Sequence, residues 1–448
     1  ISWLPQSNPS FRGNVTIPEG GRAGIAFLQL RDGYLVQPLP FTVELKDFRI
    51  EHYVTGQPKS FESDLVIHDP EREQPVEATI AVNHPLIYAG YAIYQASFDD
   101  GGSKLRLRAW PLDHPELETQ QVDAAVFESL EVETSAGRQT LEFESFRPFN
   151  VNPAPDDPDK EFRNFGPSFT YKLRNTQGEA SEYENYMLPV ELEGRKYFLS
   201  GMRESPNEPF FYLHIPADPK GSPRRFLAFN ALLHDEERVR EIAAEVVGTT
   251  FSELKLEEPG MVGEVTRTMS RLVSLFARGG FDGIARQVEN TVPEARRMQV
   301  MDAYMKVLRN ILGALYAEVL RDEGVDISAG INERDSRFYQ DALNAITALP
   351  AYGSPFFLQL ESFEQIQASG LQITRSPGKN VVYLGFTLLM IGVFMMFYVR
   401  QRRVWVWLQP QLDQTQVILA GTGERDQRDF EREFSQLYQG IRRAGESG

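Results

Sequence analysis

The alternation of apolar and polar residues predicts β-strands through most of residues 1–233. Lys104–Trp110 alternates charged with apolar side chains, as a strand with one solvent-facing side does. In Phe41–Ile50 the apolar positions change phase at Lys46–Asp47, and this change predicts a β-bulge in the strand. The pattern is therefore that of antiparallel strands with one buried face.

Turn residues divide this region at short intervals. Residues 151–168 are rich in proline and aspartate and predict an exposed loop, which is also a candidate seam between two β layers. Regular short strands with such turns are typical of an antiparallel sandwich or open barrel. We predict hairpin turns at Ser135–Arg138, Thr176–Glu179 and Glu193–Gly194.

From His234 the apolar spacing becomes helical, which predicts a helical subdomain over residues 234–350. Asp235 is placed to cap its first helix, and Gly248 is placed to end it. The apolar residues of Met298–Leu320 lie on one helical face, so this segment is expected to pack on protein. Further helices are predicted at Met261–Ala277 before Gly279–Gly280, from Pro293 to about Arg321, and at Asp335–Leu349 before Pro350.

Residues 351–380 lead away from this subdomain, with Leu371–Arg375 as a candidate strand returning to the sheet. The run 381–399 then contains no charged residue. As a helix, its 19 residues would span about 28 Å, close to the hydrocarbon core of a bilayer. The alternative is a buried core helix, although core helices of this length usually carry some polar residues.

The flanks of this run differ in charge. Lys379 stands alone before it, whereas Arg400, Arg402 and Arg403 follow it. The positive-inside rule places the arginine side, and hence residues 400–448, in the cytoplasm. The expected fold is a membrane-anchored α+β protein: a β-rich periplasmic domain, a helical insert, one C-terminal transmembrane helix and a cytoplasmic tail.

The composition of the chain argues against several classes of function. The net charge of the 448 residues is −17, which argues against a nucleic-acid partner because such a partner requires a basic surface. The chain has no cysteine, so thiolate catalysis, disulfides and thiolate-held metals are excluded from it. Neither observation fixes the compartment.

No motif for catalysis or metal binding emerges from the sequence. No two of the histidines stand three or four residues apart, no HExxH or GxSxG occurs, and the glycine pairs predict turns. The carboxylates are numerous and scattered, so they neither support nor exclude paired-carboxylate catalysis. The six histidines are His52, His68, His84, His114, His214 and His234.

Four ordered segments resemble the ResB (CcsB) family of cytochrome c biogenesis proteins. Leu39–Leu65 and Val82–Phe98 (VNHPLIYAGYAIYQASF) resemble its opening strands, and Phe11–Gly20 lies where the family's periplasmic domain begins. Ser376–Leu408 is similar to the family's final membrane helix with its Arg-rich, Trp-containing exit. Together these segments bracket most of the chain.

The resemblance implies work with a multi-spanning partner of the ResC (CcsA) type, as the system II cytochrome c synthase. The pair is expected to bring reduced haem across the bacterial inner membrane and to attach it to Cys-x-x-Cys-His of apocytochrome c. The thioether bonds would use the substrate's cysteines, so this chain would be a non-catalytic or co-catalytic subunit.

Family members usually begin with about three membrane helices, and the family's haem-handling membrane histidine belongs to that part. This chain starts at Ile1 rather than Met, so we expect these helices upstream of it. No haem ligand is therefore assigned here, and direct haem binding by this fragment is not expected.

The residues that carry the family motif VNxPL…YQ are Asn83, Pro85, Tyr94 and Gln95. Their structural interpretation is a tight turn and a buried strand. Their functional interpretation is a surface for the partner or for apocytochrome c. His84, inside the motif, is expected to be a turn residue rather than a haem ligand.

Two other function classes stay open. One is a periplasmic scaffolding or binding module of another membrane complex, which an unrelated copurifying partner would reveal. The other is an enzyme, such as a glycan hydrolase that uses carboxylates, which would require a concave site with paired carboxylates.

Overall fold

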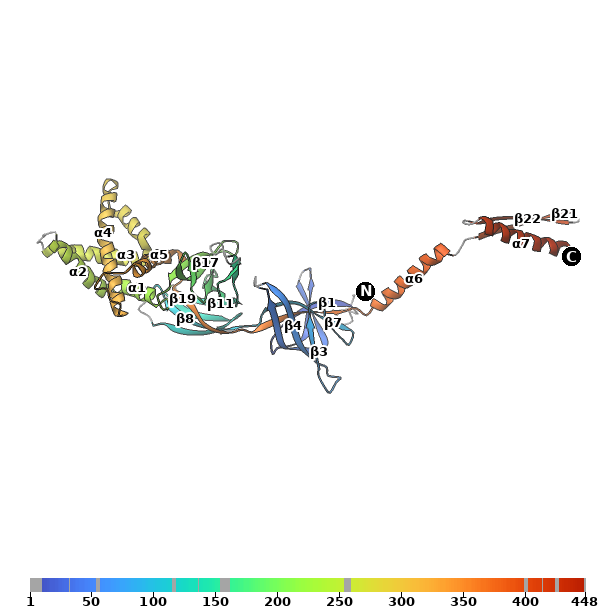
Figure 1. Cartoon of the computed structure of the whole chain (residues 1–448), viewed down its shortest axis with the longest axis horizontal. Helices are drawn as coiled ribbons and strands as arrows, with labels where there is room; N and C mark the ends of the chain where they lie inside the picture. The colour runs from blue at the N-terminus through green and yellow to red at the C-terminus, as the bar shows by residue number, and fades with distance from the viewer. Residues whose placement is uncertain are drawn as a thin grey trace. The chain divides into compact units, whose positions relative to one another are not determined.

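The computed structural model describes residues 10–31, 33–53, 57–114, 118–135, 137–153, 162–253, 259–398, 402–412, 414–423 and 427–446 (Figure 1). The chain divides into two compact units. The larger contains Gly13–Ile87 and Ala92–Ile373, and the smaller contains Ile1–Arg12, Tyr88–Tyr91 and Thr374–Gly448.

Eight of the described strands form one sheet, in the order β5-β4-β3-β2-β1-β20-β7-β6. The outer strands β5 and β6 are joined by residues 82–85 alone, and Ala81 and His84 exchange backbone hydrogen bonds there. Because the two edges are only a turn apart, the sheet must curl into an open barrel. The strands are β1 (Phe11–Pro18), β2 (Arg22–Leu30), β3 (Gly33–His52), β4 (Pro58–His68), β5 (Val76–Ala81), β6 (Leu86–Tyr88), β7 (Tyr91–Asp100) and β20 (Gln367–Arg375).

A buried polar cluster spans the barrel interior. Gln95 Oε1 on β7 accepts a hydrogen bond from Ser369 Oγ on β20 at 3.0 Å and another from Ser63 Oγ on β4. The two serine hydroxyls also lie 2.8 Å apart. In the sheet order, β4 and β20 are separated by three strands, so this contact reaches across the curled sheet. The cluster satisfies polar groups that would otherwise be costly to bury.

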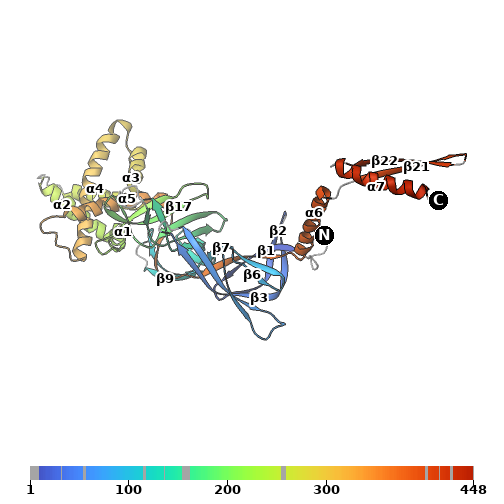
Figure 2. The same ribbon diagram turned by 45° about the vertical axis from the view of Figure 1, so that its right-hand side comes forward.

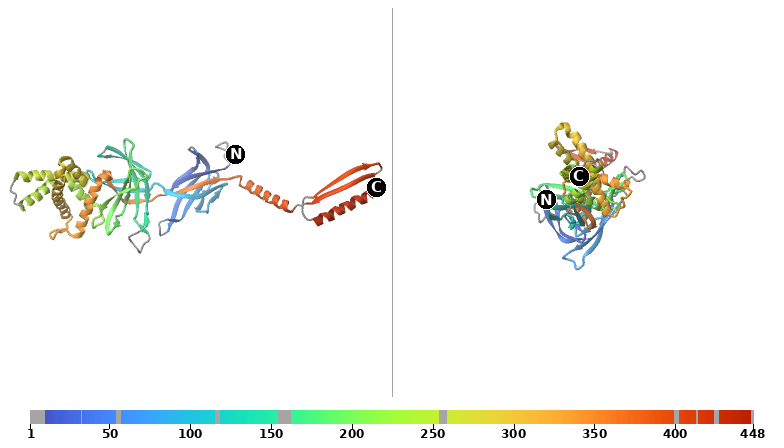
Figure 3. Two further views of the ribbon diagram at one scale, coloured as in Figure 1. Left: turned by 90° about the horizontal axis from the view of Figure 1, so that it is seen from above. Right: turned by 90° about the vertical axis from the view of Figure 1, so that its left-hand side faces the viewer.

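The predicted bulge is confirmed. The register between β3 and β4 shifts between Leu45 and Asp47, at the point where the apolar phase changes. The candidate strand at 371–375 is also confirmed, because β20 lies between β1 and β7 (Figure 3, orange strand). Backbones pack closely there: a Cβ on Gly370 would lie 2.0 Å from Ser97 Oγ, so only glycine fits without a shift.

Two neighbouring strands continue from this barrel into the next β region. β7 leads into β8 (Lys104–Pro111), and β19 (Phe356–Glu364) leads into β20. At the crossing, Gly101 N donates to Ile366 O at 2.8 Å, and a Cβ on Gly101 would lie 2.7 Å from Gln367 O. The segment between residues 101 and 366 is thus inserted through one pair of strands.

The inserted segment contains two further sheets and a small strand pair. Described strands β19, β8 and β9 (Gln120–Ala125) form one sheet. Seven described strands form the other, in the order β10-β11-β14-β15-β17-β16, with β18 also pairing β17. Their bounds are β10 (Ser129–Thr134), β11 (Gly137–Arg147), β14 (Ser168–Asn175), β15 (Ala180–Tyr186), β16 (Val190–Leu192), β17 (Arg195–Arg203) and β18 (Phe211–Pro216), and the separate pair is β12 (Val151–Pro153) with β13 (Phe162–Asn164).

The three predicted hairpins are confirmed as β10–β11, β14–β15 and β16–β17. The first turn is tighter than predicted, because Gly137 and Arg138 already pair with β10. In the third, Glu193 and Gly194 both have positive φ, as a two-residue hairpin turn requires. The centre of the predicted proline- and aspartate-rich loop, residues 154–161, lies outside the described residues. Part of the described remainder is not loop, because residues 151–153 and 162–164 pair as β12 and β13.

Five described helices lie between β18 and β19 in the chain (Figure 2). Asp235 caps α2 as predicted, because its Oδ1 accepts from Arg238 N at 3.0 Å. The apolar pattern does not predict α1: it assigns these residues to the end of the β region, which it extends to residue 233. The helices are α1 (Arg224–His234), α2 (Glu236–Glu253), α3 (Pro259–Thr291), α4 (Glu294–Asp322) and α5 (Glu333–Tyr352).

Some glycine and proline residues do not end helices where the sequence predicts. The prediction that Gly248 ends α2 is wrong: the helix continues to Glu253, since burial of residues such as Val247 outweighs the roughly 1 kcal/mol cost of a helical glycine. Gly280 does break α3, with φ 59° and ψ −158°. Pro350 is tolerated within the last turn of α5, which ends at Gly353 with φ 72°.

The helices and the seven-stranded sheet share one core. At its centre the hydroxyl of Tyr352, the last residue of α5, lies 2.7 Å from Ser200 Oγ on β17. Asn185 on β15 accepts from Ser200 and donates to Leu358 O on β19 at 2.7 Å. Burial raises the pKa of Tyr352 to about 12, so its hydroxyl remains a neutral hydrogen-bonding group.

The smaller unit contains the apolar helix α6 (Lys379–Tyr398), the hairpin of β21 (Arg402–Gln411) and β22 (Gln414–Gly423), and α7 (Gln427–Glu446). Among the described residues, α6 is the one helix long and apolar enough to cross a membrane. The prediction that this helix is C-terminal is wrong, because a folded hairpin and a helix follow it. Beyond it, the run of aromatic and β-branched residues in 404–408 favours a strand, and residues 427–446 are amphipathic.

Arg225 on α1 holds three helices together from a buried position. Its guanidinium contacts Glu323, just after α4, at 2.5 Å and Asp335 on α5 at 2.6 Å. Asp335 is in turn bound by Asn332, the N-cap of α5. Burial acts to lower the pKa of Arg225, but the two carboxylates outweigh it and raise that pKa above its ordinary value.

Arg225→Met is expected to lower the free energy of unfolding by about 3–5 kcal/mol, because it leaves two carboxylates without their buried partner. Urea unfolding followed by circular dichroism measures the change. The matched control is Arg337→Met, which removes an exposed pair with Glu333 at 3.3 Å and should cost under about 1 kcal/mol. Equal costs for the two substitutions would contradict the structural role of Arg225.

Candidate functional site

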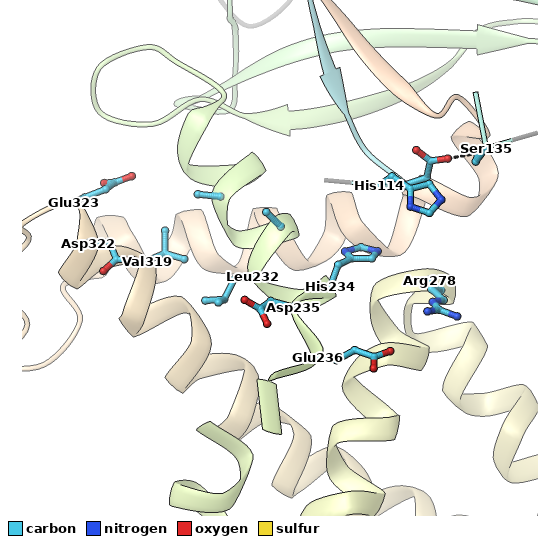
Figure 4. Close-up of a pocket in the computed structure, with 13 residues that line it drawn as sticks. His114, Ser135, Leu232, His234, Asp235, Glu236, Arg278, Val319, Asp322 and Glu323 are labelled. Carbon is cyan, nitrogen blue, oxygen red and sulfur yellow. Dashed lines mark hydrogen bonds between the residues drawn. The ribbon is translucent and has the colours of Figure 1, made fainter. Parts of the chain in front are cut away.

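A cleft of about 1180 Å³ opens where the helices meet the β region of the insert (Figure 4). Its walls come from the loop after β8, the β10–β11 turn, α1 with the start of α2, the middle of α3 and the end of α4. The lining residues are Asp113, His114, Ser135, Ala228, Ala231, Leu232, His234, Asp235, Glu236, Arg278, Val319, Asp322 and Glu323.

The break between α1 and α2 shapes one wall. α1 ends at His234, Asp235 is extended with φ −77° and ψ 94°, and α2 starts at Glu236. The Nδ1 atom of His234 is 2.9 Å from Asn230 O, one turn earlier. A polar segment between two helix ends thus faces the cleft.

The β side of the cleft is tied to the same helix. Asn230 is fully buried and donates from Nδ2 to Leu112 O at 2.9 Å, which fixes α1 against the end of β8. Asp113 accepts a hydrogen bond from Ser135 Oγ in the β10–β11 turn. Figure 4 shows the His114 and His234 rings and Arg278 toward one end of the cleft, and Asp322 and Glu323 toward the other.

Acidic groups dominate the charge of this cleft. Its described lining includes five carboxylates, two imidazoles and one guanidinium. Such a wall favours positively charged ligand groups and repels anionic ones. No group of three or more histidine, aspartate or glutamate side chains among the described residues is arranged to hold a metal ion.

The cleft was not predicted from the sequence. His114 and His234 are 120 positions apart and stand in unremarkable local surroundings, so nothing in the sequence joins them. The other histidines lie elsewhere. His52 packs on Phe149, His68 pairs with Glu44, and the Nδ1 atoms of His84 and His214 face the backbone oxygens of Val82 and Tyr212.

The motif residues occupy the barrel. Asn83 is exposed in the turn between β5 and β6 with φ 65°, and Pro85 follows it half-buried. Tyr94 and Gln95 are neighbours on β7 and point to opposite faces. Tyr94 is exposed, whereas Gln95 is buried in the interior polar cluster. The structure therefore separates an outward pair, Asn83 and Tyr94, from an inward residue, Gln95.

An exposed apolar stripe lies on the outer face of β2 and β3. Phe27 pairs with Val36, and the flanking pairs place Ile25 and Tyr34 on the same face. These four side chains are 37–72% exposed. Contiguous exposed apolar surface of this kind is typical of an interaction surface.

The chain is similar to several cytochrome c biogenesis proteins over short segments. It is 40% identical over 78 residues to CcsB of Gloeobacter violaceus, covering 17% of this chain and 16% of that protein. It is 42% identical over 102 residues to CcsB of a Synechococcus sp., covering 22% of each. A chloroplastic cytochrome c biogenesis protein of Arabidopsis thaliana is 31% identical over 99 residues, 20% of this chain and 17% of that protein.

The matched segments thus span about a fifth of the length of these curated relatives. No solved structure matches the chain. The sequence model of the ResB-like family, in contrast, matches residues 1–435, nearly all of the 448 residues. This confirms the resemblance found from the sequence segments, and the chain belongs to the ResB-like family.

Proposed function

We propose that this chain is a component of the system II cytochrome c synthase. In this role it assists the delivery of haem across the membrane and its attachment to the Cys-x-x-Cys-His segment of apocytochrome c, together with a ResC (CcsA)-type partner. The observation that carries the proposal is the family match over residues 1–435. Haem is handled as a substrate, and the chain acts as a non-catalytic or co-catalytic subunit. The thiols that form the thioether bonds belong to the apocytochrome, since this sequence has no cysteine.

The membrane topology is part of the proposal. Helix α6 crosses the bacterial inner membrane, and Arg402 and Arg403 mark the cytoplasmic side. The 20 residues of α6 are about 30 Å long, which matches the hydrocarbon core. Residues before α6 are then periplasmic, where haem attachment to apocytochrome c takes place in this scheme.

Two surfaces of the larger unit have the chemistry this role needs. The apolar stripe on β2 and β3 fits a protein partner, because its exposed aromatic and β-branched side chains would be covered on association. The acidic cleft fits a positively charged segment of apocytochrome c. The first surface is therefore assigned to the ResC-type partner and the second to the substrate polypeptide.

Deletion of the full gene is expected to abolish haem-stained cytochrome c, and expression of the intact gene should restore it. Haem staining of membrane proteins after electrophoresis measures this. Unchanged staining in the deletion strain would remove the proposed function.

Charge reversal in the cleft tests the substrate contact. Glu236→Lys with Asp322→Lys should lower the restored haem staining several-fold, because the cleft would then repel a basic segment. Glu264→Lys with Glu289→Lys makes the same charge change outside the cleft and should restore staining fully. If both double variants restore staining equally, the cleft is not the substrate contact, whereas the function itself stands.

The apolar stripe is tested by copurification. Phe27→Glu with Val36→Lys should greatly reduce recovery of a ResC-type protein and of haem Soret absorbance with the tagged full-length chain, because both side chains are exposed on that face. Gln74→Glu with Gln121→Lys introduces the same charges elsewhere and should leave recovery unchanged. An unrelated partner without Soret absorbance would favour a scaffolding module instead.

The absence of cysteine allows a direct test of topology. Glu73→Cys, in an exposed turn of the barrel unit, should react in intact spheroplasts with a membrane-impermeant maleimide. Gln439→Cys on α7 should react only after lysis. The reverse pattern would overturn the proposed orientation.

A further inference from the structure

The β21–β22 hairpin has two faces, and α7 packs on one of them near Gly421 and Gly423. A Cβ on Gly421 of β22 would lie 2.7 Å from the Phe430 ring and 2.9 Å from the Phe434 ring, so α7 packs directly on this backbone. Arg402 of β21 forms an ion pair with Glu433 of α7. Because Arg402 and Gly421 belong to the same face in the hairpin register, both contacts identify the face under α7 (Figure 2).

The opposite face carries two tryptophans. Trp405 pairs with Ala420 and Trp407 pairs with Ile418, and Arg403 lies on this same side. Trp405 is 50% exposed, Trp407 69% and Ile418 43%. In the described part of the smaller unit, no element packs on this face. It is therefore an exposed indole-rich surface with an arginine at its start.

The length of chain after α6 limits what can cover this face. α6 ends at Tyr398 and β21 begins at Arg402, so the hairpin starts within about 14 Å of the helix end. If α6 spans the bilayer, as proposed above, the start of the hairpin lies in or next to the headgroup layer. Tryptophan is the side chain that favours this layer, and arginine pairs with its phosphates.

We propose that the Trp405–Trp407 face of the hairpin binds the phospholipid surface on the side where α6 leaves the membrane. The consecutive residues Arg402 and Arg403 then contact different partners. Arg402 holds α7 through Glu433, whereas Arg403 faces the lipid phosphates. α7 lies on the far side of the hairpin from the lipid. The occupant is the bilayer itself, and the inference rests on the proposed membrane span of α6.

Tryptophan fluorescence in proteoliposomes tests this, because residues 1–448 contain four tryptophans and α6 contains none. The full-length chain with Trp3→Phe and Trp110→Phe retains the two hairpin indoles. It is reconstituted into phosphatidylcholine–phosphatidylglycerol vesicles with or without brominated acyl chains. Emission is expected to be strongly quenched by the brominated lipid, and Arg403→Gln should weaken the quenching most in anionic vesicles.

A matched control separates facing the lipid from merely being near it. Tyr438→Trp is exposed on α7 and is introduced with all four native tryptophans replaced by phenylalanine. Its emission should be quenched much less than that of the hairpin pair. Equal quenching of the two probes would overturn the assignment of the lipid-facing side, and circular dichroism verifies that both variants are folded.

Alkaline carbonate extraction of the same vesicles distinguishes this inference from the proposed function. If the chain resists extraction while the hairpin indoles are not quenched, the lipid contact is refuted and the membrane span stands. If the chain is extracted and unquenched, the membrane span fails and this inference fails with it. Protection of the indoles only with a partner protein, or only at high chain density, would assign the face to that partner or to a second copy and overturn the lipid contact.

Discussion

The placement of β20 between β1 and β7 is the constraint on which the larger unit depends. It closes the barrel around Ser63, Gln95 and Ser369, whose side chains hydrogen-bond one another across the interior. The close backbone approach at Gly370 is possible because that residue has no Cβ. Since β20 is separated from its neighbours by the whole insert, the barrel cannot be completed until residues 101–366 have returned the chain to it.

The insert depends on a shared core of helices and strands rather than on closure of a sheet. Its helices and strands share one core, and polar contacts at defined points fix their positions. Arg225 joins three helices, and Tyr352 joins the last helix to β17 through Ser200. The acidic cleft forms where α1 and α2 separate, so the same helix boundary that Asp235 caps also creates the candidate binding surface.

The smaller unit exposes apolar surface on two of its elements. α6 is exposed along its length, and the hairpin presents tryptophans opposite α7. In water both surfaces would be costly, and a bilayer removes that cost for both. The family membership and the physical chemistry of this unit therefore support the same proposal, a membrane-anchored component of cytochrome c biogenesis.

Local pattern alone determined the hairpins, the bulge at Lys46–Asp47, the apolar helix and the Asp235 cap, because each depends on neighbouring residues. Gly248 and Pro350 misled the prediction, since packing of the surrounding turns overrides a local preference. Tertiary structure alone decided that His114 and His234 share a cleft, that Gln95 faces inward, and which face of the hairpin α7 covers. These are contacts between distant residues, and a one-dimensional pattern carries no distance between them.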